Sequence, residues 1–269
     1  MSKQKQYNSE QIQVLEGLEP VRKRPGMYIG GTGREGLQHL VKEIADNSVD
    51  EAIAGHATKL SIVLQADGGV KVSDDGRGIP VDKMAKTGKS ALETVLTVLH
   101  AGGKFGGGGY KVSSGLHGVG ISVVNALSSK LKAEIHRDGF VYTQEYERGV
   151  PLTELKRSEK ASETGTTITF YPDTTIFEDT SFDYEWVVDY LRHQAYLTKG
   201  LKTQVLDERT NQRHGFYFEG GIQSYVKHLN LGKDVVDEDV FYVEKQVEDS
   251  GVEIALQYSD SFTETIKAF

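Results

Sequence analysis

GGKFGGGGYKVSSGLHGVG, residues 102–120, holds nine glycines in nineteen positions and is the most informative stretch of the chain. Glycine costs roughly 0.5–1 kcal/mol relative to alanine inside a regular element, so such a run indicates a demand on the backbone itself. The stretch continues into ISVVNALS, an apolar helical pattern. Because a glycine-rich loop at a helix N-terminus binds anions through its N–H groups, the stretch predicts a phosphate site. A surface loop or linker is the alternative, although linkers do not run into a hydrophobic helix.

The composition is that of a soluble globular chain with an acidic charge balance. The 269 residues suffice for one large domain, or for a domain and part of another. The chain has no apolar run long enough to span a membrane, no signal-peptide pattern and no cysteine, which together favour the cytoplasm. A net charge of -8 disfavours non-specific DNA binding by this chain alone. The short basic run at residues 22–24 precedes a proline and is interpreted as a solvated turn.

Hydrophobic periodicity predicts helices interleaved with antiparallel strands. Helical patterns cover residues 34–55, 90–100, 119–128 and 184–197, and Ser90 with Glu93 forms a capping box. Strand patterns cover residues 59–64, 70–73, 131–137, 140–146, 166–171 and 201–206, and the first two read as a hairpin. Beyond Gly220 the pattern restarts with a helix and with strands at 240–247 and 252–258. The restart predicts a second domain that is cut short.

The first long helix carries a polar stripe beside its apolar face. The stripe recurs at steps of three and four residues and consists of His39, Glu43, Asp46, Asn47 and Asp50. Acidic side chains on one stripe repel each other unless a cation or basic partner is present, and Lys42 is predicted to point aside. A carboxylate one turn from an amide suits hydrolysis, because the carboxylate polarises a water and the amide oxygen ligates Mg²⁺. A solvated polar face is the alternative.

DDGRGIP, residues 74–80, directly follows a predicted strand. A carboxylate at a strand end beside glycines can accept a hydrogen bond from a ligand amino group, which contributes roughly 1.5–3 kcal/mol. An ordinary Asp-Gly turn is equally consistent with the pattern. Gly165-Thr166-Thr167 opens a later strand and is weak evidence by itself.

Two further glycine motifs imitate phosphate-binding loops. GTGREG at residues 31–36 fits the dinucleotide fingerprint but lacks a proper preceding strand. GKS at residues 88–90 imitates the end of a P-loop, yet Lys83 stands where that loop needs a glycine. Neither dinucleotide nor P-loop chemistry is expected.

Taken together, the chain resembles the ATPase subunits of bacterial type II topoisomerases, within the superfamily of gyrase, heat-shock chaperones, histidine kinases and MutL. The match runs in order through VLEGLEPVRKRPGMYIG, HLVKEIADNSVDEA, DDGRGIP, LHAGGKFGGGGYKVSSGLHGVGISVVNALS and HRDGFVYTQEYERG. It covers essentially the whole chain. VRKRPGMYIG and LHAGGKF are specific to topoisomerases, and YERGVP is more similar to the gyrase B type than to the corresponding part of topoisomerase IV.

The resemblance implies a site for ATP and Mg²⁺. Glu43 would be the general base for the attacking water, His39 would help to orient that water, and Asn47 would hold Mg²⁺ against the triphosphate. Asp74 would bind the adenine amino group with support from Thr166, and Tyr110 would lie near the adenine. The other implied nucleotide-binding residues are Gly78, Gly103, Lys104, Lys111, Leu116, His117, Gly118, Val119 and Gly120. Tyr7, in an N-terminal arm, would reach the nucleotide of a partner subunit.

The resemblance also implies a pocket mouth where the family's aminocoumarin inhibitors bind. The residues implied there are Arg77, Ile79, Pro80 and Arg137. The sequence departs from the usual family pattern at Asp75, Ser90 and Ser114, which replace Asn, Pro and Gly. Asp75 is expected to add negative charge close to Asp74, and no departure removes a catalytic group.

The implied fold is α+β, a two-layer sandwich of the Bergerat type with a mixed, mostly antiparallel sheet and helices on one face. The ATPase domain with its arm would occupy residues 1–219, and a transducer domain would begin at residues 220–269. ATP binding would drive homodimerisation through the arm, and the full enzyme would couple hydrolysis to DNA strand passage together with gyrase A, the other gyrase polypeptide. DNA would be contacted by parts outside this chain, and no membrane is involved. The lysine expected at the terminal phosphate would lie beyond Phe269, so this chain alone is expected to hydrolyse ATP poorly.

Several rival functions are weighed against this one. The ATPase component of topoisomerase IV, a MutL-type repair protein and a chaperone ATPase share the nucleotide motifs. A non-catalytic nucleotide-sensing module is a rival of another class, and the presence of Glu43 with His39 argues against it. A histidine kinase is disfavoured because no phosphoacceptor helix precedes the site.

Overall fold

Alternating burial along the strands builds one large sheet. The structure is a computed structural model, and it describes residues 14–103, 118–247 and 250–269. β1 (Lys59–Leu64) buries Leu60, Ile62 and Leu64 on one face, as a strand resting on a core requires. The other strands of this sheet are β2 (Val70–Asp74), β3 (Ser128–Arg137), β4 (Phe140–Glu147), β5 (Val150–Pro151), β6 (Lys156–Lys160), β7 (Gly165–Pro172), β8 (Lys202–Asp207) and β9 (Gln212–Phe216).

The sheet has nine strands in the order β5–β4–β3–β7–β2–β1–β8–β9, with β6 paired to β4 outside that path. β1 and β8 are parallel, whereas all the other pairs are antiparallel. The expected hairpin of β1 and β2 is present, with Leu60 opposite Asp74 and Leu64 opposite Val70. This register leaves Asp74 at the end of a central strand, beside Thr166 of β7.

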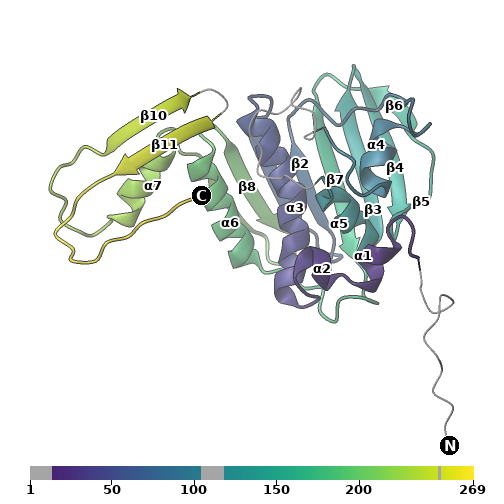
Figure 1. Ribbon diagram of the computed structural model, residues 1–269, viewed down its shortest axis with the longest axis horizontal. Helices are drawn as coiled ribbons and strands as arrows, with labels where there is room; N and C mark the ends of the chain where they lie inside the picture. The colour runs from purple at the N-terminus through teal and green to yellow at the C-terminus, as the bar shows by residue number, and fades with distance from the viewer. Residues whose placement is uncertain (1–13, 104–117, 248–249) are drawn as a thin grey trace, which may run out of the picture.

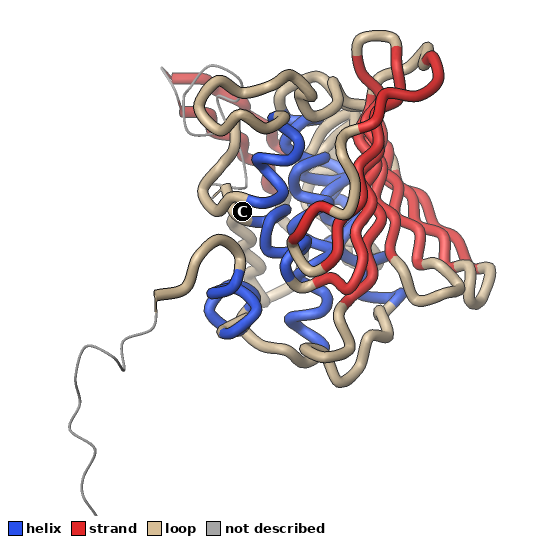
Figure 2. The backbone as a smooth tube through the Cα atoms, turned by 90° about the vertical axis from the view of Figure 1, so that its right-hand side faces the viewer, coloured by secondary structure: helices blue, strands red, loops and turns tan. Residues whose placement is uncertain are grey.

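Helices cover one face of the sheet, so the expected two-layer α+β fold is confirmed (Figures 1 and 2). They are α1 (Glu19–Lys23), α2 (Gly26–Ile29), α3 (Arg34–Ile53), α4 (Ala91–Thr97), α5 (Gly120–Ala126) and α6 (Tyr184–Leu197). α3 packs on β1, β2 and β7, α5 on β3 and β4, and α6 on β8 and β9. The core between the layers is apolar and fully buried at residues such as Leu40, Val124 and Phe170.

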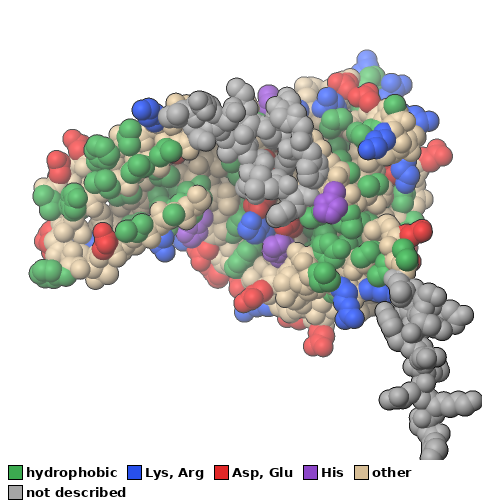
Figure 3. Space-filling model, viewed as in Figure 1, with side chains coloured by type: hydrophobic (Ala, Val, Ile, Leu, Met, Phe, Trp, Pro, Cys, Tyr) green, Lys and Arg blue, Asp and Glu red, His purple; other side chains and the backbone are tan. Residues whose placement is uncertain are grey.

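A smaller unit follows the main sheet. α7 (Ile222–Leu229) contacts α6 and the hairpin of β10 (Phe241–Val247) and β11 (Ser250–Leu256), which forms a separate two-stranded sheet. Figure 3 shows hydrophobic side chains gathered over this hairpin. They include Phe241, Val243, Val252, Ile254 and Leu256, which are between 39% and 56% exposed. Among the described residues, no helix is both long enough and apolar enough to cross a bilayer.

The structure corrects three expectations about local elements. The helix expected at residues 119–128 ends at Ala126, and Ser128 already begins β3. The basic run at residues 22–24 is not a solvated turn, because Arg22 lies in α1 and its guanidinium pairs with Asp173 at 2.7 Å. The capping box forms only in half: the Ser90 hydroxyl accepts from Glu93 N at 3.0 Å, while the Glu93 carboxylate pairs with Lys89 and Gln144.

Candidate functional site

Helix α3 brings three of the predicted site residues onto one stripe. His39, Glu43 and Asn47 are four residues apart, and a helix places such positions one above another. His39 Nε2 lies 2.8 Å from Glu43 Oε1, and both side chains are about one third exposed (36% and 31%). Asn47 Nδ2 donates to the Glu43 carbonyl at 2.8 Å, so the amide oxygen is the atom directed away from that carbonyl. The stripe therefore offers an oriented carboxylate and an amide oxygen side by side.

The first residue of α5 lies against the Glu43 carboxylate. A Cβ added at Gly120 would lie 2.0 Å from Glu43 Oε2 and 3.0 Å from its Cδ, so a side chain fits there only if the Glu43 carboxylate moves. Glycine at this position is therefore a steric requirement of the Glu43 rotamer. Gly118, at φ +61°, and Val119, the N-cap of α5, immediately precede it. Gly120, the last residue of the glycine-rich stretch, thus places the N-terminus of α5 beside the stripe of His39, Glu43 and Asn47.

Asp74 forms a second part of the site at the end of β2. Its Oδ2 accepts from the Ser48 hydroxyl at 2.7 Å, and its Oδ1 accepts from Gly76 N at 3.0 Å and Thr166 N at 3.3 Å. Burial raises the pKa of Asp74, the three hydrogen bonds oppose that rise, and the nearby charge of Glu51 adds to it. Asp74 is thus a fixed hydrogen-bond acceptor, and the predicted pairing with Thr166 takes place through the Thr166 backbone.

Glycines let the backbone close around Asp74. A Cβ at Gly165 would lie 2.3 Å from the Asp74 carbonyl oxygen, and one at Gly78 would lie 2.7 Å from the His136 carbonyl oxygen. Gly78 also has φ +73°, a left-handed conformation that glycine adopts readily. The bend of residues 74–80 against β3 and β7 therefore depends on these glycines.

The four residues expected at the pocket mouth lie on and beside this bend. The Arg77 guanidinium pairs with Glu51 of α3 through two hydrogen bonds, 2.7 Å from Oε1 and 3.1 Å from Oε2. Arg137, near the end of β3, donates to the Gly78 carbonyl at 2.7 Å and to that of Arg77 at 3.3 Å. Ile79 is half-buried and Pro80 is exposed. Both arginines thus hold the bend in place from opposite sides.

Two charged side chains near the site form bonds that the sequence did not predict. Asp75, next to Asp74 in the chain, directs its carboxylate to Thr58 and Lys59 and accepts from Thr58 N and Oγ1 and from Lys59 N at 2.6–2.8 Å. The polar stripe of α3 also divides in two, since Lys42 pairs with Asp46 instead of pointing aside. Asp46 accepts a second bond from the Tyr190 hydroxyl of α6 at 2.6 Å and so belongs to the α3–α6 contact.

Several predicted residues lie outside the described residues, and one expected residue lies at their edge. Tyr7, Lys104, Tyr110, Lys111, Leu116, His117 and the family departure Ser114 are all in this set. Gly103 is exposed and is the last described residue before residue 104. The structure therefore brings together His39, Glu43, Asn47 and Gly120 at one place and Asp74, Thr166 and Gly78 at another, both along α3 and its neighbouring strands.

Sequence reasoning missed Ser48 and Glu51 as partners of the site. Both lie on α3, and Glu51 is four residues beyond Asn47, so the helical step that selected Glu43 and Asn47 also selects Glu51. Ser48 faces the sheet and is 3% exposed, which made it indistinguishable from a small core residue. Its hydrogen bond to Asp74 can be seen only in the structure, because the two residues are 26 positions apart in the sequence.

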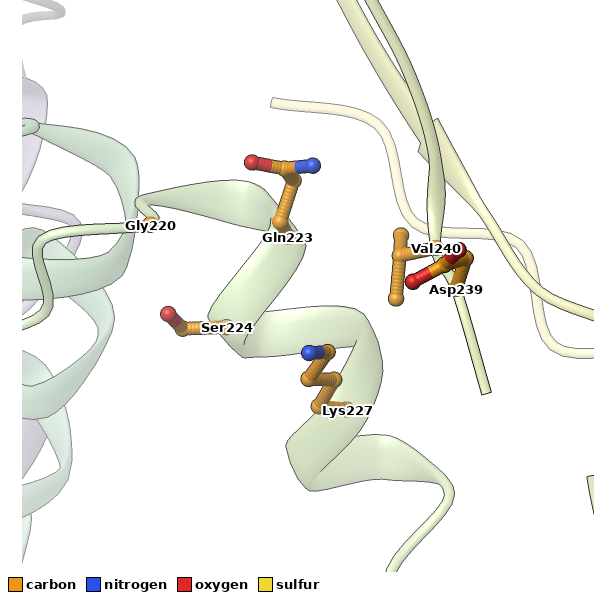
Figure 4. Close-up of a pocket in the computed structure, with 6 residues that line it drawn as sticks. All are labelled: Gly220, Gln223, Ser224, Lys227, Asp239 and Val240. Atoms are coloured by element: carbon orange, nitrogen blue, oxygen red, sulfur yellow. The ribbon is translucent and has the colours of Figure 1, made fainter. Parts of the chain in front are cut away.

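A separate hollow of about 390 Å³ lies in the C-terminal unit. Figure 4 shows Gln223, Ser224 and Lys227 of α7 on one side of it and Asp239 with Val240 on the other. None of these residues belongs to the site on α3. In the parts of the chain that the structure describes, no three histidine or carboxylate side chains lie close enough together to hold a metal ion.

Comparison with known proteins identifies a family for this arrangement. Residues 32–176 match the family described as "Histidine kinase-, DNA gyrase B-, and HSP90-like ATPase". The matched range is more than half of the chain and contains every described site residue named above. ATP binding is therefore a property of this part of the chain.

Curated relatives and a solved structure extend the likeness over nearly the whole chain. The chain is 53% identical over 270 residues to DNA gyrase B of Streptococcus pyogenes serotype M18, covering 99% of this chain and 42% of the relative. It is 52% identical over 267 residues to DNA gyrase B of Enterococcus faecalis, covering 98% and 42%. The chain thus spans about two fifths of the length of these curated relatives. It is also similar to the 43K ATPase domain of Thermus thermophilus gyrase B, crystallised in complex with an aminocoumarin, with a TM-score of 0.83, 40% identity and coverage of 91% of this chain and 63% of that one.

Proposed function

Because the chain belongs to the family of histidine kinase-, DNA gyrase B- and HSP90-like ATPases, we propose that it is the ATP-hydrolysing part of a bacterial type II topoisomerase, a DNA gyrase B. The proposal is carried by one observation: the His39–Glu43 pair lies against the N-terminus of α5, directly after the glycine-rich stretch. A general base next to a phosphate-binding helix terminus is the arrangement that nucleotide hydrolysis requires.

Glu43 acts as the general base in this proposal. Its carboxylate takes a proton from a water whose oxygen attacks the terminal phosphorus, while the bond from that phosphorus to the bridging oxygen breaks and ADP leaves. His39 holds Oε1 at 2.8 Å, so Oε2, on the side of Gly120, is the oxygen that receives the proton. The backbone of Gly118, Val119 and Gly120, together with Gly103, Lys104, Lys111, Leu116 and His117, binds the phosphates.

Asn47 provides a protein ligand for Mg²⁺. Asn47 Nδ2 donates to the Glu43 carbonyl, which orients the amide with its oxygen directed away from that carbonyl, and an amide oxygen is a ligand type that a hard cation accepts. Asn47 would supply a single protein oxygen. This is sufficient for Mg²⁺, because waters and the oxygens of substrate phosphates commonly fill its other coordination positions. When bound, Mg²⁺ neutralises charge on the phosphates.

Asp74 binds the adenine amino group. The carboxylate is already fixed by Ser48, Gly76 and Thr166, so a purine amino group meets a preoriented acceptor. Gly78, whose lack of a side chain lets the bend pack against β3, would contribute to base binding through its backbone, and Tyr110 would lie near the base. The mouth formed by Arg77, Ile79, Pro80 and Arg137 receives aminocoumarins, the compound class present in the Thermus thermophilus complex.

This chain spans about two fifths of the length of its curated relatives, and in a protein of that length we expect hydrolysis to be coupled to assembly. ATP closes a homodimer through the N-terminal arm, with Tyr7 reaching the partner's nucleotide, and gyrase A and DNA join through other parts. Residues 1–219 form the ATPase domain and residues 220–269 begin a transducer domain. This boundary is supported by the separate β10–β11 sheet and its exposed apolar side chains.

Replacing Glu43 by alanine in the full-length protein tests the proposal. We expect ATP affinity to stay within a few-fold by calorimetry, while turnover measured by phosphate release falls roughly 10²–10⁴-fold, the usual contribution of a general base. Glu35→Gln, an exposed acid in the first turn of the same helix, is the matched control and should keep both values. Equal losses of binding and turnover in Glu43→Ala would refute the role of Glu43 as base.

A further inference from the structure

Three polar side chains are buried together behind the proposed nucleotide site, and each has an unsatisfied atom. Asn125 of α5 and Gln144 and Tyr146 of β4 are all 0% exposed. Asn125 Oδ1, Gln144 Oε1 and the Tyr146 hydroxyl have no hydrogen-bond partner among the described residues. Native proteins rarely leave buried polar atoms unpaired, so three in one region require an explanation.

Two of the three side chains bond to α4, and the third lies on the same strand face as one of them. Asn125 Nδ2 donates to the Leu96 carbonyl at 2.8 Å, and Gln144 Nε2 donates to Glu93 Oε2 at 3.0 Å. Gln144 and Tyr146 are two residues apart on β4, so they project from the same face of the strand. Burial raises the pKa of Tyr146, and the charge of Glu93 adds to the effect, so the phenol stays protonated and can donate. The bonds of Asn125 and Gln144 to α4, and the shared strand face of Gln144 and Tyr146, gather the three side chains in the region of α4, α5 and β4.

The orientation of both amides is fixed by their partners. Gln144 Nε2 faces two acceptors, Glu93 Oε2 and the Thr153 carbonyl at 3.1 Å, and a flipped amide would set its oxygen against both. A flipped Asn125 would likewise oppose its oxygen to the Leu96 carbonyl. The two amide oxygens therefore point away from these acceptors, and each still needs a donor.

We propose that Asn125, Gln144 and Tyr146 enclose a binding site for one internal water molecule. Such a water donates one hydrogen bond to Asn125 Oδ1 and one to Gln144 Oε1, and it accepts one from the Tyr146 hydroxyl. Three hydrogen bonds to otherwise unpaired groups are the usual number for a buried water. This arrangement gives each of the three unpaired atoms one hydrogen bond.

Other occupants fit this chemistry less well. An anion would face two amide oxygens and the Glu93 carboxylate, all of which repel it. A metal cation prefers more oxygen ligands than these three atoms provide, and the nearby Glu93 charge is already paired with Lys89 at 2.9 Å. An apolar occupant would leave all three polar atoms unpaired.

The site joins the two helices that flank the glycine-rich stretch in sequence. α4 ends at Thr97, five residues before Gly102, and α5 begins at Gly120, whose Cα lies against Glu43. A water held by α5 and β4 at this place fixes α5 to the sheet through a hydrogen-bonded bridge, in addition to apolar packing.

A crystal structure of this chain that shows ordered solvent is the direct test. We expect one density peak within hydrogen-bond distance of Asn125 Oδ1, Gln144 Oε1 and the Tyr146 hydroxyl, with no anomalous signal after soaking in rubidium or thallium salts. An empty space would overturn the proposal, and so would an anomalous peak, because it would replace the neutral water by a cation.

Stability measurements give an independent test. Tyr146→Phe and Gln144→Met each remove one partner of the same water, so their effects on Tm should be non-additive, and Tyr146→Phe should shift Tm less in the Gln144→Met background than alone. Tyr171→Phe is the matched control, because its hydroxyl bonds to Asp67 at 2.9 Å and should add independently to Gln144→Met. Additive shifts for the Tyr146 and Gln144 pair would contradict a shared water. If Gln144→Met does not fold, Asn125→Ala with Tyr146→Phe provides the same comparison.

Discussion

Asp74 and Asp173 are both held by backbone N–H groups, yet they lie in opposite electrostatic surroundings. Asp173, 1% exposed, accepts from Arg22 Nη2 at 2.7 Å and from Arg148 Nε at 2.8 Å, in addition to Thr175. Asp74 accepts from a serine hydroxyl and two backbone groups, and it forms no ion pair with the described residues. One region therefore neutralises its carboxylate and the other does not.

The difference sets the proton affinity of each group in opposite directions. Burial alone would raise the pKa of Asp173, but the bonds from Thr175, Arg22 and Arg148 outweigh burial and hold it well below its usual range. At Asp74 burial prevails and the pKa rises. A carboxylate with two arginines stabilises the fold, whereas one without a cation keeps its attraction for an incoming donor. The contrast thus separates a structural acid from an acid available to a ligand.

Among changes that leave the Glu43 side chain itself intact, the largest expected effect comes from crowding the site at Gly120. Gly120→Ala places a Cβ where Glu43 Oε2 now lies, so the carboxylate must leave its position. A displacement of this size can cost on the order of 100-fold in turnover, measured by phosphate release in the full-length protein. Gly33→Ala is the control, because a Cβ there meets nothing within 4 Å and its φ is -83°. Wild-type turnover in Gly120→Ala would show that this close approach has no catalytic role.

The contrast between Asp74 and Asp173 is tested most directly by removing the charge of Asp74. Asp74→Asn removes the charge but keeps an oxygen for Gly76 and Thr166, and we expect ATP to bind roughly 10–100-fold more weakly, as the loss of a charged hydrogen bond predicts. Since the raised pKa makes ionisation of Asp74 costly in the folded state, the variant without ligand should be at least as stable at pH 7. That difference should vanish below about pH 4, where the unfolded group is also protonated. Calorimetry and thermal melts measure both, and unchanged ATP affinity would exclude adenine binding by Asp74.

The opposite result is expected at Asp173. Asp173→Asn should lower the stability of this chain by about 1.5–3 kcal/mol at pH 7, a shift of roughly 3–10 °C in Tm. Because the folded pKa is lowered, the contribution of Asp173 is complete above the unfolded pKa of about 4 and is lost as the pH falls further. Melts at several pH values should therefore converge for wild type and variant in acid. Asp189→Asn, which breaks an exposed pair with Arg192, is the control and should change little.

The smallest effects should rank the two arginines of the Asp173 cluster. Arg22→Gln loses the bond to Asp173 and a 2.7 Å bond to the Ala126 carbonyl, so we expect about 1–2 kcal/mol of lost stability. Arg148, 45% exposed, should contribute about 1 kcal/mol or less. Urea unfolding of both variants tests this order, and a larger loss for Arg148→Gln would reverse our assignment of the main cation.

Local patterns in the sequence predict the elements that carry their own signals. The helix at residues 184–197 has the expected bounds, because Asp183 caps it by accepting from Glu185 N and Trp186 N and its apolar face is periodic. β6 and β9 were missed, since their side chains are mostly exposed and show no alternation. The short helix α2 also lacks a detectable period at four residues.

The contacts of the candidate site also differ in how far a local sequence pattern predicts them. The co-location of His39, Glu43 and Asn47 follows from the helical step alone and could be predicted. The hydrogen bond between Asp74 and Thr166 spans 92 residues, and the pairing of Arg22 with Asp173 spans 151. Such contacts depend on the order of the strands and on how the helices pack on the sheet, which a local hydrophobic period does not predict. The resemblance to known ATPase subunits supplied roles for residues such as Asp74 that the pattern alone left ambiguous.

The parallel pairing of β1 with β8 has a consequence for biosynthesis. Residues 59–64 leave the ribosome well over a hundred residues before their partner at 202–207, a delay on the order of ten seconds at typical elongation rates. During that interval the nascent chain presents an unpaired strand edge that bears Leu60, Ile62 and Leu64, beneath the helix that carries Glu43. Chaperone occupancy and aggregation of stalled nascent chains should therefore drop sharply once residue 207 has emerged.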